Sequence, residues 1–272
     1  MVPHGAYLGD ALDPGQPLIS ARSIDLNADL GEHDGDGFAH DDAILDVVSS
    51  ASIACGAHAG SLSVMRKTVA SAYSKGVSIG AHPGYPDREG FGRRDTALSI
   101  AAIGDSIAAQ IEKLGDCCNV EGARLVYVKP HGALYNRAAN DDELATELVT
   151  RIAELDETLV ILTLPESALG RMAAQNGIRV AREAFIDRAY MRDGRLVPRS
   201  QENAVIHDIE TAARRAVEMA RDRSVLAIDG EPIGIDAESL CVHGDSANAL
   251  EAVTEARRQL EAAGFSIAPF AR

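Results

Sequence analysis

Short apolar runs alternate with longer amphipathic segments along the chain from residue 23 onward. The short runs are rich in β-branched and aliphatic residues, as in buried strands, and the longer segments repeat apolar residues at helical spacing. This order predicts repeated βα units around a parallel sheet. Strands are predicted at residues 23–27, 52–55, 77–81, 124–129, 158–163, 179–183 and 239–243, and residues 265–268 can supply one more. Helices are predicted at residues 41–50, 61–75, 96–115, 141–155, 167–176, 207–222 and 246–263.

Two segments carry especially clear local signals. Between the last helices, Asp229-Gly230 lies between alternating apolar residues, which predicts a β-hairpin. The helix predicted at residues 96–115 has one apolar face that can pack on a sheet. That face is formed by Ile100, Ile103, Ile107, Ile111 and Leu114.

The number of repeats favours a closed barrel, because an open doubly wound sheet usually has fewer βα units. We therefore expect an α/β barrel at residues 23–272, as a single domain, behind a flexible arm at residues 1–22. In both architectures the chemistry belongs at the C-terminal ends of the strands.

The composition of the chain limits the classes of partner that it can bind and indicates the cellular compartment in which it works. Of 272 residues, 26 are Lys or Arg and 41 are Asp or Glu, and the resulting net charge of −15 repels nucleic acid and anionic membranes. The four cysteines form no CxxC pair, which indicates a reducing compartment. The opening residues lack the apolar stretch of a signal peptide, and no segment is long and apolar enough to span a membrane. We expect a cytoplasmic protein.

Polar residues gather where the predicted strands end. The blocks are DLNADLGE from Asp25, ACGAHAG from Ala54, GAHPGYP from Gly80, KPHGALYN from Lys129 and CVHGD from Cys241. Four of the eight histidines lie in these blocks, each within two residues of a glycine. A barrel brings strand ends to one mouth, so imidazole, ammonium and carboxylate groups would meet around one small molecule. A single one of these histidines, or of the carboxylates, could equally be a turn or capping residue.

Two kinds of cation stand out. Lys129 closes an apolar strand, and a buried ammonium needs a carboxylate or an anionic ligand, so an electrostatic role is expected. Arg93 and Arg94 follow the third strand, and Arg188 and Arg199 follow the sixth. Such arginines suit the binding of a carboxylate or phosphoryl group, although surface salt bridges explain any one of them equally well.

At these blocks the chain resembles the LamB/YcsF family. The matching stretches are DLNADLGE from Asp25, SIACGAHAG from Ser52, IGAHPGYPDREGFGRR from Ile79, VKPHGALYN from Val128, EAFIDRAY from Glu183, LVPRS from Leu196 and LCVHGD from Leu240. The chain departs from the family pattern at Ser52, Ala57 and Ser61, where Asn, Phe and Asp are common.

The resemblance implies a (β/α)7 TIM-like barrel related to the glycoside hydrolase/deacetylase superfamily. It also implies a reaction, the opening of the lactam of 5-oxo-L-proline to L-glutamate, coupled to ATP hydrolysis and carried out with 5-oxoprolinase subunits B and C. The chain has no GxxxxGK[ST] phosphate loop, so we expect the partner subunits to bind the ATP.

We expect these residues to divide into two sets. The catalytic set is Asp29, Lys129, His131 and His243. The substrate-binding set is Asp25, Asn27, Glu32, His58, His82, Arg93, Arg94, Arg188 and Asp245. Which group acts as general base is left open.

Two other functions remain open from the sequence. One is a divalent-metal hydrolase that removes acyl groups, since Asp and His are suitable zinc ligands, although the familiar deacetylase motif with two nearby histidines is absent. The other is a non-catalytic subunit that binds a small acid or carbohydrate for a partner.

Overall fold

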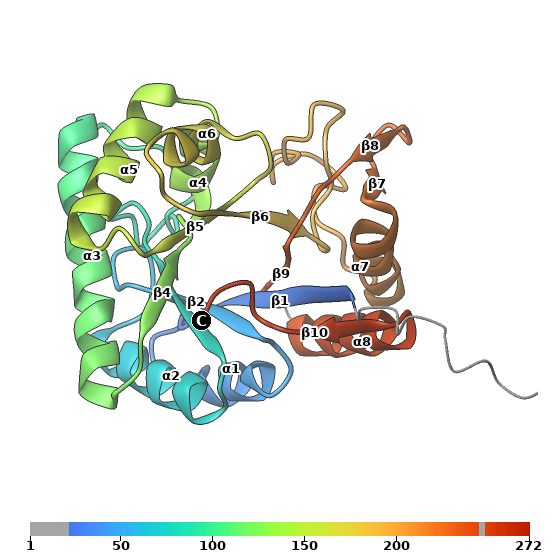
Figure 1. Cartoon of the computed structure of the whole chain (residues 1–272), viewed down its shortest axis with the longest axis horizontal. Coiled ribbons are helices and arrows are strands. Elements are labelled where there is room, and N and C mark those ends of the chain that lie inside the picture. The colour runs from blue at the N-terminus through green and yellow to red at the C-terminus, as the bar shows by residue number, and fades with distance from the viewer. Residues whose placement is uncertain (1–21, 245–247) are drawn as a thin grey trace, which may run out of the picture.

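Seven parallel strands close into a barrel in the structure, a computed structural model that describes residues 22–244 and 248–272 (Figure 1). Closure is direct, because β1 pairs with β2 on one side and with β9 on the other. In order around the ring the strands are β1 (Arg22–Leu30), β2 (Ser50–Ala54), β3 (Ser78–His82), β4 (Leu125–Val128), β5 (Val160–Thr163), β6 (Val180–Phe185) and β9 (Ser239–His243). The closed α/β barrel predicted from the sequence is thereby confirmed.

Three further strands lie outside this ring. The eighth predicted run forms β10 (Phe265–Ile267), which pairs only with the first residues of β1. The predicted hairpin is confirmed, because β7 (Ser224–Leu226) and β8 (Pro232–Gly234) pair in antiparallel fashion across the Asp229-Gly230 turn.

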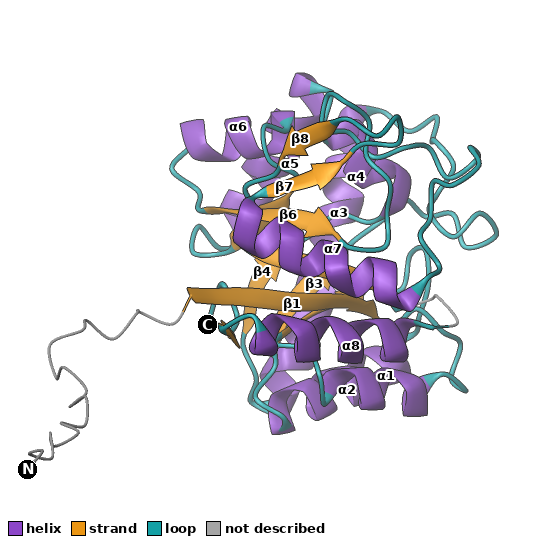
Figure 2. Cartoon of the chain, turned by 90° about the vertical axis from the view of Figure 1, so that its right-hand side faces the viewer, coloured by secondary structure: helices purple, strands orange, loops and turns teal. Residues whose placement is uncertain are grey.

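Helices cover the outside of the ring, as Figures 1 and 2 show. They are α1 (Phe38–Leu45), α2 (Leu62–Ser74), α3 (Ile100–Glu121), α4 (Gly132–Ala138), α5 (Asp142–Leu155), α6 (Ala168–Gln175), α7 (Ile209–Asp222) and α8 (Ala249–Ala262). Most of the apolar core lies between them and the outward-facing strand residues. The predicted stripe on α3 packs there, since Ile103, Ile107, Ile111 and Leu114 are at most 2% exposed.

Some element boundaries differ from those predicted. The α3 helix continues through Gly115 and ends at Gly122, whose φ of 69° is the left-handed conformation that glycine adopts easily. The short α4 helix, which begins directly after His131, was not predicted from the sequence. Of the predicted N-terminal arm only Arg22 is described, and it opens β1; residues 1–21 lie outside the described residues.

The C-terminal residues of the chain close the end of the barrel at which the strands begin. The Ser78 hydroxyl donates to the carbonyl oxygen of Ala271 at 2.7 Å, and the Phe270 ring contacts the Tyr127 ring at 4.9 Å between centroids. Tyr127 belongs to a small apolar cluster at this end. In the part of the chain that the structure describes, the cavity lies at the C-terminal ends of the strands, called the mouth below. Among the described helices, none has the length and apolar character needed to cross a bilayer.

The Tyr127 ring occupies the space in which a side chain at position 80 of β3 would lie. The two residues are register partners on neighbouring strands, and a Cβ atom at position 80 would lie 2.1–2.4 Å from the tyrosine ring. Real Cβ atoms do not approach other atoms so closely, so the ring can enter the barrel only because residue 80 is glycine.

We expect Gly80→Ala to lower the free energy of unfolding by about 1–3 kcal/mol, because a fully packed interior must absorb the added methyl group. Gly234→Ala is the matched control, since nothing lies within 4 Å of its Cβ position. Urea unfolding measures both. In a Tyr127→Ala background the Gly80→Ala substitution should cost much less, and an equal cost in both backgrounds would contradict this account.

Candidate active site

The inner face of β1 is polar. Side chains alternate along a strand, so Leu26, Ala28 and Leu30 pack outward, while Asp25, Asn27 and Asp29 point into the barrel. From the sequence, this strand is expected to end at residue 27, with Asp29 in the loop that follows. The strand is longer because the alternating polar residues line a polar interior.

Asp25 lies deepest in the barrel and does not reach the mouth. Its carboxylate accepts hydrogen bonds from the hydroxyl groups of Ser49, Ser50 and Ser239 at 2.6–2.7 Å. Burial raises the pKa of Asp25 to about 6, against the lowering effect of those hydrogen bonds. Asp25 was expected to bind substrate, but it is not among the residues that line the cavity described below, and its contacts support the interior of the barrel.

Asn27 forms the next layer and is also removed from the mouth. Its amide donates to Glu183 Oε1 at 2.7 Å, and its oxygen accepts from the Ser52 hydroxyl at 3.0 Å. Ser52 also bonds the Tyr127 hydroxyl at 3.1 Å. Ser52 thus lies inside the barrel, and the contacts of Asn27 are with residues that support the interior.

Lys129 occupies the centre of the polar interior. Its ammonium lies 2.7 Å from Asp29 Oδ1, 2.7 Å from Glu183 Oε1 and 3.0 Å from Cys241 Sγ. Burial alone would lower the pKa of Lys129, but the neighbouring Asp29, Cys241 and Glu183 raise it well above its usual range. Lys129 is therefore a fixed cation, which agrees with the electrostatic role expected from the sequence.

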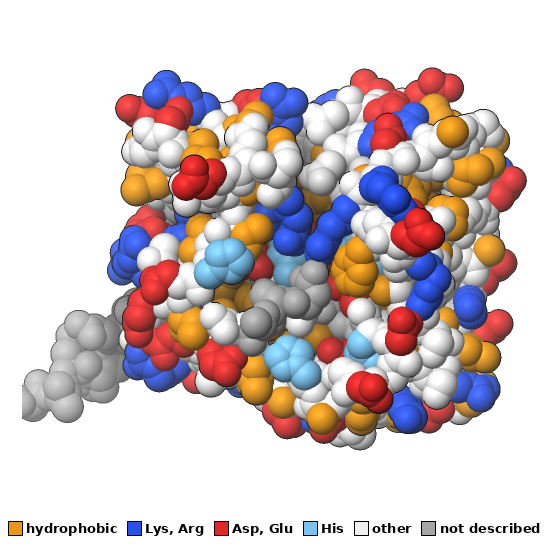
Figure 3. Space-filling model, turned by 180° about the vertical axis from the view of Figure 1, so that it is seen from behind, with side chains coloured by type: hydrophobic (Ala, Val, Ile, Leu, Met, Phe, Trp, Pro, Cys, Tyr) orange, Lys and Arg blue, Asp and Glu red, His pale blue; other side chains and the backbone are white. Residues whose placement is uncertain are grey.

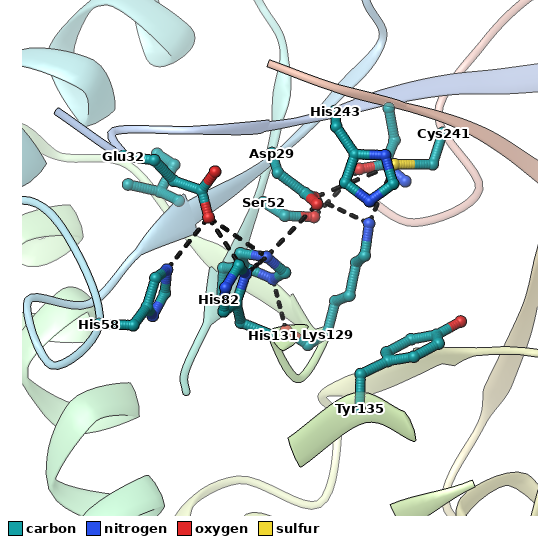
Figure 4. Close-up of polar contacts among 12 residues, drawn as sticks. Asp29, Glu32, Ser52, His58, His82, Lys129, His131, Tyr135, Cys241 and His243 are labelled. Atoms are coloured by element: carbon teal, nitrogen blue, oxygen red, sulfur yellow. Dashed lines mark hydrogen bonds and ion pairs between the residues drawn. The ribbon is translucent and has the colours of Figure 1, made fainter. Parts of the chain in front are cut away.

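Three histidines from three strand ends surround Glu32 above this centre (Figure 4). His131 Nδ1 and His58 Nε2 each lie 3.1 Å from Glu32 Oε1, and His82 Nε2 lies 3.8 Å from the same oxygen. The His58 and His131 rings stack at 3.8 Å. The predicted convergence of these side chains is confirmed.

Neighbouring charges decide the protonation of this cluster. Burial acts to raise the pKa of Glu32, but the neighbouring His131 and His58 lower it well below its usual range. Burial lowers the pKa of His58 to about 4, although Glu32 opposes that effect. For Asp29, too, burial acts to raise the pKa, and nearby His82 and Lys129 outweigh it and lower the pKa well below its usual range. Glu32 and Asp29 are therefore carboxylates near neutral pH.

His243 is oriented by an acid on the opposite side of the mouth. Its Nδ1 lies 2.9 Å from Asp187 Oδ2, and its backbone N–H donates to the same oxygen at 3.1 Å. The Phe185 ring stacks on the imidazole at 5.3 Å. A carboxylate that fixes Nδ1 directs Nε2 of a histidine outward, which is the usual arrangement of a general base.

These groups meet at a cavity of about 650 Å³, a size typical of small-molecule sites. Asp29, His82, Lys129, His131 and His243 line its inner part. Its rim is cationic, and Figure 3 shows Lys and Arg side chains gathered beside a hollow near the middle of this face. The arginines that line the cavity are Arg93, Arg137, Arg188, Arg195 and Arg199.

The arginines predicted to bind substrate differ in their positions. Arg188 is 4% exposed and donates to the carbonyl oxygens of Ala204 and Val197; burial and the nearby Arg199 lower its pKa to about 10, so it remains a cation. Arg94, also expected to bind substrate, is exposed, pairs with Asp87 and is not among the residues that line the cavity. Asp245 lies outside the described residues.

Several participants were not predicted from the sequence. Glu183, Asp187, Tyr135 and Cys241 all contact the residues above, and the Tyr135 hydroxyl donates to Glu183 Oε2 at 3.0 Å. Each of these residues lies in one of the polar blocks at the strand ends, so the sequence did indicate the right segments. It does not indicate which of the alternating residues in a block point into the barrel. All four cysteines are free and buried.

The arrangement can bind an anion and move protons. The rim and Lys129 offer positive charge for carboxylate or phosphoryl oxygens, and His243 and Asp29 offer proton acceptors. One further group stands out among the described residues, since Glu32, His82 and His131 bring one ligand atom each to within 4.8 Å of one another, as a metal site would require.

The LamB/YcsF family model matches residues 24–272. The chain is 44% identical over 247 residues to a protein of Pyrococcus furiosus that bears the name of the A subunit of 5-oxoprolinase, covering 90% of this chain and 97% of that one. A solved structure titled lactam utilization protein, from Thermus thermophilus, superposes with a TM-score of 0.85 at 42% identity and covers 91% of this chain and all of its own.

A more distant likeness concerns the fold alone. The catalytic domain of a peptidoglycan N-acetylglucosamine deacetylase from Eubacterium rectale superposes with a TM-score of 0.51 at 11% identity, over 97% of this chain and 92% of that one. The chain and this catalytic domain therefore share a barrel fold.

The buried Asp25 makes stability depend on pH. Its pKa of about 6 in the folded chain exceeds its ordinary value of 3.8, so the folded chain binds this proton more tightly than the unfolded chain. The contribution is present below about pH 4 and is lost as pH rises through about 6. We expect the free energy of unfolding to fall by about 3 kcal/mol over that interval relative to Asp25→Asn, measured by urea unfolding.

Asp116→Asn is the control for this measurement, because Asp116 is exposed on α3. It should keep the wild-type dependence on pH. Parallel pH profiles for the wild type and Asp25→Asn would show that Asp25 does not titrate in this way.

Proposed function

Because the chain belongs to the LamB/YcsF family, we propose that it opens the lactam ring of 5-oxo-L-proline to L-glutamate as the A subunit of an ATP-hydrolysing 5-oxoprolinase. The observation that carries the proposal is the cavity itself, in which a cationic rim faces Lys129, Asp29 and His243. The 5-oxoproline molecule carries a carboxylate and an amide, and this cavity offers charges for the first and proton acceptors for the second.

The division of work follows from the chemistry of the lactam. The ring amide is a poor electrophile, and transfer of the ATP γ-phosphoryl group to its oxygen would activate the ring carbon. Water then attacks that carbon, the C–N bond breaks, and the nitrogen takes a proton. A second water hydrolyses the acyl phosphate to glutamate and phosphate. The chain has no phosphate loop, so subunits B and C bind the ATP in this proposal.

The contacts in the cavity suggest roles for its residues. Lys129 stabilises negative charge on the oxygens, and Arg93 and Arg188 bind the carboxylate or phosphoryl group. His243 is the preferred general base, because Asp187 holds its Nδ1 side. His131 is less suited to that task, because its Nε2 lies 2.8 Å from the Phe91 carbonyl oxygen and its Nδ1 lies 2.9 Å from His82 Nε2.

A second candidate function is a metal-dependent deacetylase-like hydrolase. The grouping of Glu32, His82 and His131 favours it. Release of acetate from acetylated sugars by the isolated chain, without ATP, would support this candidate against the lactam reaction. A non-catalytic binding subunit would instead bind 5-oxoproline while substitutions in its cavity left the turnover of the complex unchanged.

We expect Asp29→Asn and Lys129→Ala each to lower turnover by at least about 10²-fold, because each removes a charge from the cavity. We expect a loss of the same size for His131→Ala, because it removes an imidazole that lines the cavity and contacts His82 and Glu32. The measurement is glutamate release from 5-oxo-L-proline and ATP by the chain reconstituted with subunits B and C.

Lys67→Ala and Asp116→Asn are the matched controls, since both residues are exposed on outer helices. They should turn over as the wild type does. Near-normal rates in all three cavity variants, with folding verified by circular dichroism, would refute the proposed function.

A further inference from the structure

We propose that Glu32, His82 and His131 form a binding site for one divalent ion of the first transition series, with Zn²⁺ as the first choice. The three side chains come from three different strand ends, β1, β3 and β4, and bring one ligand atom each to within 4.8 Å of one another (Figure 4).

The hydrogen bonds of the two imidazoles fix which nitrogen carries a proton. His82 Nδ1 lies 2.8 Å from the carbonyl oxygen of Lys129, and His131 Nε2 lies 2.8 Å from that of Phe91. A carbonyl oxygen only accepts, so both nitrogens must be N–H donors. In the neutral rings the remaining nitrogens, His82 Nε2 and His131 Nδ1, then carry lone pairs.

These two lone pairs point at each other across only 2.9 Å. Two acceptors at this distance repel unless a cation lies between or beside them. The Glu32 carboxylate completes the group, at 3.1 Å from His131 Nδ1 and 3.8 Å from His82 Nε2. Ligand atoms around one tetrahedral Zn²⁺ at about 2.0–2.1 Å lie about 3.3–3.4 Å apart, close to the middle of this range.

The surroundings match those of metal-binding histidines. Such histidines usually donate their other N–H to a carbonyl or a carboxylate, which fixes the ring orientation, and both rings do so here. His58 holds the third ligand in place, because its Nε2 contacts Glu32 Oε1 at 3.1 Å and its ring stacks on His131. Asp29 Oδ2 lies 3.4 Å from His82 Nε2 and adds negative charge.

Two imidazoles and one carboxylate form a ligand set found in catalytic zinc sites, which leave one position open. His82 and His131 line the cavity, so the open side would face a bound ligand. An ion bound there would supply a Lewis acid for a carbonyl oxygen or for water. That role rests on the proposed function, whereas the site itself does not.

The competing occupant is a proton shared by the two imidazoles. Metal binding separates the two cases. We would remove bound metal from the full chain with a chelator and titrate it with Zn²⁺, and separately with Co²⁺, by calorimetry and visible absorption near neutral pH. One equivalent of each ion should bind, and the Co²⁺ form should show visible absorption bands. A wild-type chain that binds neither ion overturns the proposal.

Substitutions of the proposed ligands test whether the ion binds at this site. Glu32→Gln and His131→Gln should each weaken binding of Zn²⁺ by at least about 10-fold, because each removes a ligand. His243→Gln is the matched control, a histidine of the same cavity that lies with Asp187 instead, and it should bind Zn²⁺ as the wild type does. Equal affinity in Glu32→Gln, His131→Gln and the wild type overturns the site.

A second measurement covers variants that fail to fold. X-ray absorption spectroscopy of the zinc-loaded wild-type chain should count two imidazole ligands, and a count of none or one overturns the proposal. These results are independent of lactam turnover. A chain that binds zinc through this site but never opens the lactam refutes only the proposed function, and one that opens the lactam without binding metal refutes only the metal site.

Discussion

The buried contacts of Lys129 with Asp29 and Glu183 hold the polar interior of the barrel together. The two carboxylates come from β1 and β6, which lie on opposite sides of β9 in the ring, and both are within 2.7 Å of the ammonium. TIM barrels are usually filled by branched apolar side chains, and unpaired buried charges are costly. Lys129 compensates the charges of Asp29 and Glu183, and removal of one partner from a buried ion pair commonly costs about 3–5 kcal/mol.

Polarity inside the barrel increases toward the mouth. Hydroxyl groups surround Asp25 at the closed end, an amide and Glu183 follow, and the ions and imidazoles lie beneath the cavity. The rim then adds arginines, although the whole chain carries a net charge of −15. A local cationic site in an acidic protein attracts small anions while the rest of the surface repels polyanions.

Much of this architecture could be predicted from the sequence, and the failures have physical reasons. The spacing of apolar runs identified the barrel strands, and glycine-flanked histidines identified the strand ends that converge. The inward-facing residues of β1 were harder to place, because a polar interior removes the apolar alternation by which strands are identified. Asp187 and Glu183 were missed as site residues because only the closed ring shows which residues face His243 and Lys129. The pairing of Arg94 with Asp87 depends on the path of its loop, which no local pattern specifies.

The contact between Gly80 and the Tyr127 ring has a consequence for the history of such barrels. Position 80 cannot accept a larger residue while Tyr127 stays in place, because the ring occupies the space where a side chain on β3 would lie. A lineage that gains a side chain at position 80 must first shrink residue 127, and the Ser52 hydroxyl then loses the phenol that it bonds. We therefore expect residues 52, 80 and 127 to vary together among homologous proteins, as one correlated set.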